Sequence, residues 1–78
     1  MLMDVVRQTR VTVPDLEKRI KELREASGRS AQSLATEAGI STAYWYQIEK
    51  GDRQYITEDV LRGIEKALGV DLGVSFND

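Results

Sequence analysis

The chain contains no cysteine and no histidine, and these two absences exclude several kinds of site. Without cysteine there is no disulfide framework, no thiolate metal site and no cysteine nucleophile. Without histidine, the commonest general base and the commonest metal ligand are missing. The 13 carboxylates form no recognisable acid–base or metal-binding pattern, and no glycine-rich phosphate loop occurs. We therefore expect no enzyme activity, no cofactor and no bound metal ion.

Long apolar runs are also lacking. No stretch approaches the roughly 20 apolar residues that cross a bilayer, and no basic segment followed by an apolar one opens the chain. We expect a soluble, cytoplasmic protein that does not contact a membrane. Its 78 residues are enough for one domain with a thin core, which dimerisation would help to stabilise.

The charge is slightly acidic but unevenly distributed. There are 11 Lys and Arg residues against 13 Asp and Glu residues, for a net charge of -2. Residues 1–53 carry nine basic and eight acidic side chains, whereas residues 54–78 carry two and five. Because nucleic-acid binding depends on the charge of one face, this balance does not exclude a DNA-binding surface in the first two thirds.

Glycine and the single proline divide the chain into segments of helical length. In the first segment, Leu16, Ile20 and Leu23 recur at helical spacing, and the charged residues between them are expected to face solvent. Gly63 lies inside the last predicted helix, where a glycine destabilises the helix by about 1 kcal/mol. A close backbone contact at this position, within the domain or across a dimer, would explain the glycine. We predict four helices. Pro14 opens the first as its first residue, Ser30, Ser41 and Thr57 cap the other three, and the four helices end at Gly28, Gly39, Gly51 and Gly69.

Both ends of the chain have the pattern of β-strands. Residues 5–13 are rich in β-branched side chains, and residues 70–78 alternate between apolar and polar positions. An isolated strand is unstable, so we expect the two terminal strands to pair, within one chain or across a dimer.

These patterns predict a mainly α fold in a single domain. We expect a compact four-helix domain with short terminal β-strands that pair within the chain or across a dimer. We divide it into an N-terminal strand or arm over residues 1–13, a helical core over 15–69, and a C-terminal strand and tail over 70–78.

A short turn, Gly39-Ile40-Ser41, joins the second and third predicted helices, which is typical of a helix-turn-helix unit. Around this turn the positions that match a known family are Leu34, Ala35, Gly39, Ile40, Ser41, Ile48, Glu49, Gly51, Ala67, Leu68 and Gly69. On these residues, over about residues 15–70, the chain resembles the phage-repressor helix-turn-helix proteins, the Cro/C1-type or XRE family. This resemblance implies a compact, lambda-repressor-like helix-turn-helix domain, a bundle of four or five helices whose second motif helix enters the DNA major groove, usually as a dimer on a two-fold site.

Helical geometry divides residues 42–50 into two faces. At 100° per residue, Trp45 and Ile48 face the core, and the opposite face is free to contact DNA. We predict base contacts from Thr42, Ala43, Tyr46 and Gln47, of which Thr42, Ala43 and Gln47 occupy positions that contact bases in the resembling family. We predict phosphate contacts from Arg29, Gln32, Lys50 and Arg53, with Arg7 and Arg10 as additions. Glu49 is expected to bind a backbone amide or a nearby arginine.

The chain also departs from the family pattern. Ala31 replaces the usual phosphate-binding Gln at the second position of the second helix, and Asp52 replaces a commonly basic residue. The loop Gln54–Ile56 is one residue longer than usual and lacks its proline, and a strand replaces the fifth helix.

We therefore predict a sequence-specific regulator of transcription that binds double-stranded DNA as a homodimer, as a repressor or an antitoxin-type regulator. Its partners would be DNA, a second copy and, in some settings, a toxin or another regulator. It would associate with the nucleoid when bound to DNA. The alternative is an adaptor that keeps the fold but binds a protein through the aromatic cluster at residues 44–46.

Overall fold

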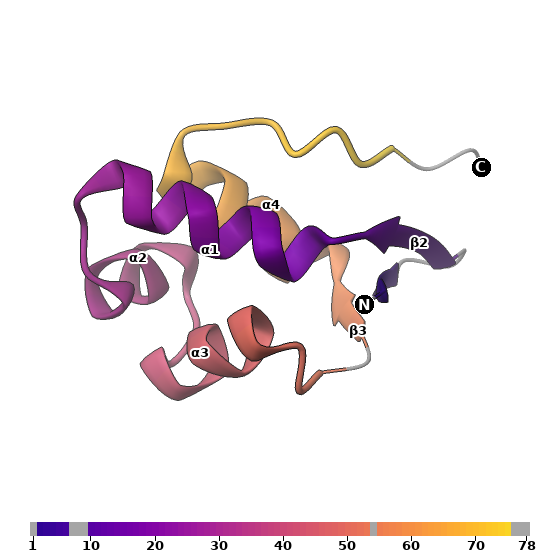
Figure 1. The fold of residues 1–78 in the computed structure, drawn as a ribbon, viewed down its shortest axis with the longest axis horizontal. Coiled ribbons are helices and arrows are strands. Elements are labelled where there is room, and N and C mark those ends of the chain that lie inside the picture. The colour runs from indigo at the N-terminus through magenta and orange to yellow at the C-terminus, as the bar shows by residue number, and fades with distance from the viewer. Residues whose placement is uncertain (1, 7–9, 54, 76–78) are drawn as a thin grey trace.

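A computed structural model describes residues 2–6, 10–53 and 55–75 of the chain. In this part, four helices form a bundle, and a three-stranded sheet lies at one end of it (Figure 1). The mainly α helix-turn-helix fold predicted from the sequence is confirmed. The helices are α1 (Leu16–Ser27), α2 (Ala31–Ala38), α3 (Thr42–Lys50) and α4 (Glu58–Leu68).

The predicted helix boundaries agree with the structure at α2, α3 and α4. The hydroxyl groups of Ser30, Ser41 and Thr57 each accept a hydrogen bond from the backbone N–H three residues later, as N-caps do. The start of α1 was predicted wrongly, because Pro14 ends a strand and Asp15, with φ 57°, makes the turn into the helix. The predicted solvent-facing charge run is also wrong at Glu17, which is buried.

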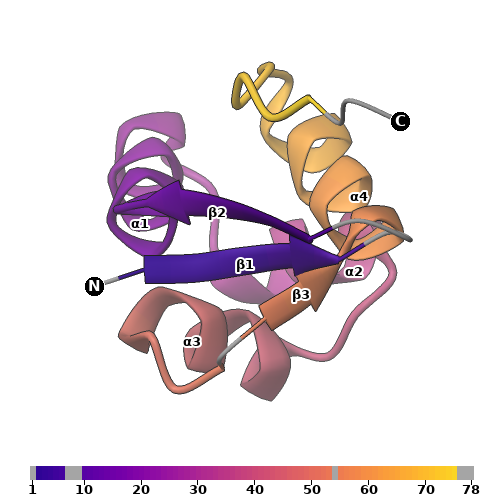
Figure 2. The same ribbon diagram turned by 90° about the vertical axis from the view of Figure 1, so that its right-hand side faces the viewer.

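The sheet corrects the prediction of one N-terminal strand over residues 5–13. Two antiparallel strands occupy this region, β1 (Leu2–Val6) and β2 (Arg10–Pro14), with Val5 opposite Val11. The third strand, β3 (Tyr55–Thr57), pairs with β1 in parallel, in a segment that the sequence analysis treated as a loop. Figure 2 shows β1 between the other two strands.

The core lies where the helices meet the inner face of the sheet. Trp45 is its largest side chain and is 0% exposed. Side chains from β1, β3 and all four helices contribute, so the sheet and the bundle share one core. The buried apolar residues are Met3, Val5, Leu16, Ile20, Ala31, Leu34, Ala35, Trp45, Ile48, Ile56, Leu61, Ile64, Ala67, Leu72 and Val74.

Gly63 makes the close backbone contact that its position in a helix predicts. A Cβ atom added to Gly63 would lie 2.5 Å from the carbonyl oxygen of Ala38, the last residue of α2. The contact lies within the domain, between α4 and the end of α2. It therefore fixes the position of the turn that leads into α3.

The C-terminal segment is not a strand over residues 70–75, which corrects the second strand prediction. Leu72 and Val74 are buried, as the alternation implies, but Gly73 has φ 75°, which interrupts the extended backbone. The segment runs along α1 and α4 (Figure 1). Side chains bind its backbone where a partner strand was expected: Arg19 donates to the Leu72 carbonyl, Arg62 donates to the Val74 carbonyl, and the Glu65 carboxylate accepts from the Leu72 N–H.

Candidate nucleic-acid interface

The corner between α2 and α3 is built from local hydrogen bonds and small side chains. The N–H of Ile40 donates to the carbonyl of Ala35 at 3.0 Å, which closes the end of α2. Ala35 is buried, so the two helices approach closely, and Ile40 is half-buried against the core. Ser41 then begins α3 by accepting from the N–H of Tyr44 at 3.0 Å.

Helix α3 is held on the core by one face. Trp45 and Ile48 are buried, as predicted, and Tyr44 is half-buried beside them. Because these side chains fill the space beneath α3, the helix has a fixed rotation about its own axis. The opposite face is therefore presented to solvent in one orientation.

A polar cluster of Arg24, Trp45 and Glu49 joins α3 to α1. Glu49 accepts two hydrogen bonds from Arg24, at 2.6 and 3.1 Å, and a third from the indole N–H of Trp45 at 2.6 Å. The Glu49 side chain is only 4% exposed. The hydrogen bond to Glu49 raises the pKa of Arg24, against the opposing effect of desolvation. Glu49 thus binds a nearby arginine, one of the two partners expected from the sequence.

The predicted base-contact residues lie together on α3. Ala43, Tyr46 and Gln47 are exposed, and Thr42 is partly exposed in the first turn. Tyr46 is 43% exposed. Lys50 is exposed at the end of the helix. The face predicted to contact bases is therefore open to solvent, although the guanidinium carbon of Arg24 lies 5.9 Å from the ring centre of Tyr46 at its edge.

The other predicted phosphate contacts occupy different environments. Gln32 is exposed in the first turn of α2, and Arg53 is exposed just after α3, with its guanidinium carbon 4.3 Å from the ring centre of Tyr44. Arg29 instead binds the carbonyl of Ala67 and the side chains of Ser33 and Glu37. Arg7 and the side chain of Arg10 lie outside the described residues.

The departures from the family pattern have visible consequences. Ala31 is buried, so that position contributes to the core, and Gln32 beside it takes the exposed place. Asp52 is exposed at the end of α3 and brings negative charge close to Lys50 and Arg53.

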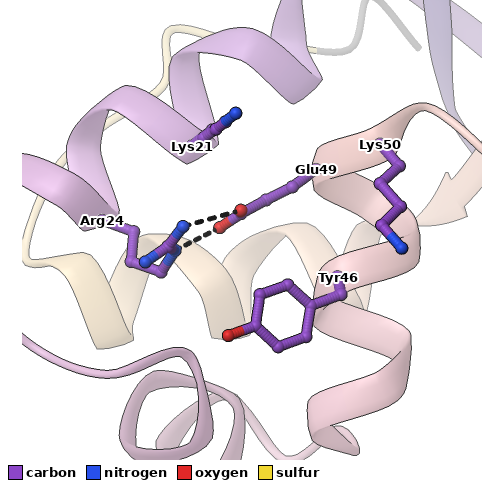
Figure 3. Close-up of a pocket in the computed structure, with 5 residues that line it drawn as sticks. All are labelled: Lys21, Arg24, Tyr46, Glu49 and Lys50. Atoms are coloured by element: carbon purple, nitrogen blue, oxygen red, sulfur yellow. Dashed lines mark hydrogen bonds and ion pairs between the residues drawn. The ribbon is translucent and has the colours of Figure 1, made fainter.

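A hollow of about 270 Å³ opens between α1 and α3 (Figure 3). Lys21 and Arg24 line it from α1, and Tyr46, Glu49 and Lys50 line it from α3. The sequence analysis placed Lys21 only in the charge run and did not predict that it lines a hollow. Its spacing of three residues from Arg24 places both side chains on the same side of α1 and is the sequence signal for this position.

Comparison with known families agrees with this geometry. A family model described as a helix-turn-helix domain matches residues 15–74, which is most of the chain. The chain belongs to this family. No curated protein and no solved structure matches this helix-turn-helix chain.

Membership of the helix-turn-helix family indicates a DNA-binding regulator in general terms, and domains of this kind are typically not enzymes. Within residues 2–6, 10–53 and 55–75, no group of carboxylates could ligate a metal ion. None of the helices in the described part of the chain has the length and hydropathy that crossing a bilayer requires.

Proposed function

We propose that this protein is a sequence-specific regulator of transcription of the Cro/C1 type, a repressor or an antitoxin-type regulator, that binds double-stranded DNA as a homodimer. It works in the cytoplasm, associated with the nucleoid when bound to DNA. The proposal rests on the combination of a helix-turn-helix domain with an exposed, unpacked face on α3.

The two-faced structure of α3 is the observation that carries the proposal. An α-helix with its side chains is about 10–12 Å wide, and the major groove of B-DNA is about 12 Å wide. The buried Trp45 and Ile48 fix the helix, while the exposed Gln47 and Tyr46 project from it. A rigid helix with polar and aromatic groups on its outer face fits the groove without rearrangement.

Each exposed residue has a chemical role in this proposal. Gln47 forms two hydrogen bonds with an adenine, and Thr42 and Ala43 contact thymine methyl groups. Tyr46 contacts a base edge. Gln32, Lys50 and Arg53 contact phosphates, and Arg29 is the weakest candidate because its guanidinium already has partners within the chain.

Dimerisation would place two copies of α3 in successive major grooves, one helical turn of DNA apart. The sheet supports this part of the proposal, because β2 is an outer strand in the described part of the chain and one of its edges has no partner there. An unpaired strand edge is a template for pairing with another chain. A toxin or another regulator would be a further protein partner.

The adaptor alternative depended on an aromatic surface at residues 44–46. Trp45 is buried and Tyr44 is half-buried with Arg53 stacked on its ring, so Tyr46 is the exposed aromatic of this group. Tyr55 is also exposed, but it lies on β3. Tyr46 and Asp52 remain the features that favour an adaptor.

The proposal is tested by selecting duplexes from a random-sequence pool with the purified protein and measuring affinity by fluorescence anisotropy. Gln47→Ala removes two base-specific hydrogen bonds, so affinity for the selected duplex should fall about 5- to 150-fold, with much less change on a scrambled duplex. Thr36→Ala, an exposed change on α2, serves as the matched control and should leave the affinity unchanged.

Footprinting of the selected duplex should show two protected half-sites about one helical turn apart. Failure of the wild-type protein to enrich or bind any duplex, even at low salt, would contradict the regulator and favour the adaptor.

A further inference from the structure

The hollow between α1 and α3 has a net positive lining. Lys21, Arg24 and Lys50 supply three cations, and Glu49 supplies one carboxylate. The two hydrogen bonds from Arg24 to Glu49 pair those two charges with each other. Two ammonium groups are left to determine which ligand the hollow attracts.

Neither ammonium group is neutralised by the described part of the chain. Glu17 and Glu25 lie one turn from Lys21 on either side, but neither forms an ion pair with it within residues 2–6, 10–53 and 55–75. Lys50 likewise has no acidic partner in these ranges. Both side chains are exposed and can reach an anion that approaches the hollow.

The lining residues occur at helical spacings that point them to the same side. Lys21 and Arg24 are three residues apart on α1, and Tyr46, Glu49 and Lys50 are three and four residues apart on α3. Figure 3 shows the two groups across from each other. Tyr46 and Lys50 also belong to the exposed face of α3, so the hollow borders the surface proposed to enter the groove.

The geometry of the DNA major groove indicates which part of the DNA would lie beside the hollow. The major groove is bounded by a phosphate backbone on each side, and a helix that fills the groove lies close to both. In the proposed complex, the exposed Gln32 in the first turn of α2 would face one backbone. On the other side, α1 and the hollow are where the second backbone would pass.

We propose that the hollow binds a phosphate group of the DNA backbone, with Lys21 and Lys50 supplying the positive charge. This inference rests on the proposed DNA-binding function and adds α1 to the interface. The hollow is open to solvent, as a continuous polymer requires, and the ammonium groups match a phosphate as point charges. Arg24 is held by Glu49, so its charge is paired and the net positive charge of the hollow comes from the two lysines.

The direct test is Lys21→Gln, measured by anisotropy on selected and scrambled duplexes at several salt concentrations. Loss of one phosphate contact should weaken binding several-fold on both duplexes. It should also reduce the slope of log affinity against log salt by about 1. Lys66→Gln on α4 is the matched control, because it makes the same charge change at an exposed lysine that does not line the hollow.

A second arm identifies the phosphate. Duplexes that carry one neutral methylphosphonate linkage at each position in turn should reveal a linkage whose neutralisation weakens the wild-type protein but not the Lys21→Gln variant. A double-mutant cycle of Lys21→Gln and Lys50→Gln should be non-additive, because the two side chains share one ligand.

The outcomes separate this inference from the proposed function. If the wild-type protein binds DNA and Lys21→Gln leaves both the affinity and the salt slope unchanged, the inference is wrong and the proposed function stands. If the wild-type protein binds no duplex, the proposed function fails, and an NMR titration with inorganic phosphate decides whether the hollow is an anion site. Amide shifts around Lys21 and Lys50, absent in Lys21→Gln, would support it, and no shift there would overturn it.

Discussion

Among single residues, Glu49 affects both the stability of the domain and the packing of α3 against α1. Its carboxylate satisfies a buried indole N–H and two guanidinium N–H groups at the same time. Polar groups in such a place are costly when left without partners. The cluster therefore stabilises the domain and also determines the distance between α1 and α3, on which the hollow depends.

Glu49→Ala should lower the free energy of unfolding by about 2–3 kcal/mol, because it leaves Arg24 and the Trp45 indole without their acceptor. Glu49→Gln keeps an acceptor oxygen and should cost less. Chemical denaturation measures both, and Glu22→Ala, an exposed carboxylate on α1, should change stability by less than about 0.5 kcal/mol. Equal stability of Glu49→Ala and the wild type would show that the cluster is not a stabilising element.

At the scale of elements, the position of α3 depends on a contact it does not itself make. Helix α4 approaches the end of α2 at Gly63, where a side chain has no space. The turn from α2 into α3 begins directly after this contact. A glycine that weakens α4 locally therefore allows the close approach of α4 to α2, on which the geometry of the helix-turn-helix unit depends.

Gly63→Ala tests whether helix propensity or the close contact with Ala38 has the larger effect on stability. Helix propensity alone favours alanine by about 1 kcal/mol. The new Cβ would lie 2.5 Å from the Ala38 carbonyl oxygen, so the helices must separate. We expect a net loss of about 1–2 kcal/mol in the free energy of unfolding, in the range known for overpacked cores.

Thermal or urea denaturation of Gly63→Ala gives the sign of the effect. The difference in stability between Lys66→Ala and Lys66→Gly, at an exposed position on the same helix, isolates the propensity contribution. A Gly63→Ala protein that is more stable than the wild type would show that propensity outweighs the contact.

At the scale of the whole molecule, both termini complete the helical core, and they do so differently. The N-terminal hairpin brings Met3 and Val5 into the core and pairs with β3. The C-terminal segment covers α1 and α4 with Leu72 and Val74, and side chains hold its backbone. A chain of 78 residues has a thin core, so these additions matter for stability.

Leu72→Ala should lower the free energy of unfolding by about 2–5 kcal/mol, as expected for a buried leucine. The neighbouring Ser75→Ala, at an exposed position, should have an effect within about 0.5 kcal/mol. Urea denaturation of the two variants side by side makes the comparison. If Leu72→Ala were as stable as Ser75→Ala, the segment would not be part of the folded core.

The features that could be predicted from the sequence are those that depend on residues close together in the chain. Helix boundaries at Ser30, Ser41 and Thr57 were predictable because capping is chemistry between residues three positions apart. The buried face of α3 followed from helical periodicity for the same reason. Local patterns are sufficient wherever the interaction is local.

Some of the errors concern partners that are distant in sequence, and others concern a local signal that is missing or misleading. The apolar alternation of residues 70–75 predicts that one side of the segment is buried. It does not predict whether the backbone carbonyl groups accept hydrogen bonds from a partner strand or from the side chains of Arg19 and Arg62. The strands β1 and β2 were predicted as one strand because residues 5–13 contain no glycine, proline, asparagine or aspartate. Lys21 is exposed, as predicted, but the sequence did not predict that it lines the hollow, because its neighbours there on α3 lie 25 or more positions away.

The proposed function requires that the exposed face of α3 binds DNA. Chemical-shift mapping of the labelled protein during titration with a selected duplex observes this face residue by residue. We expect the largest changes at Thr42, Ala43, Tyr46, Gln47 and Lys50, with smaller ones at Lys21 and Gln32 and none along the C-terminal segment. Changes confined to the sheet, with α3 unaffected, would rule out this DNA-binding face.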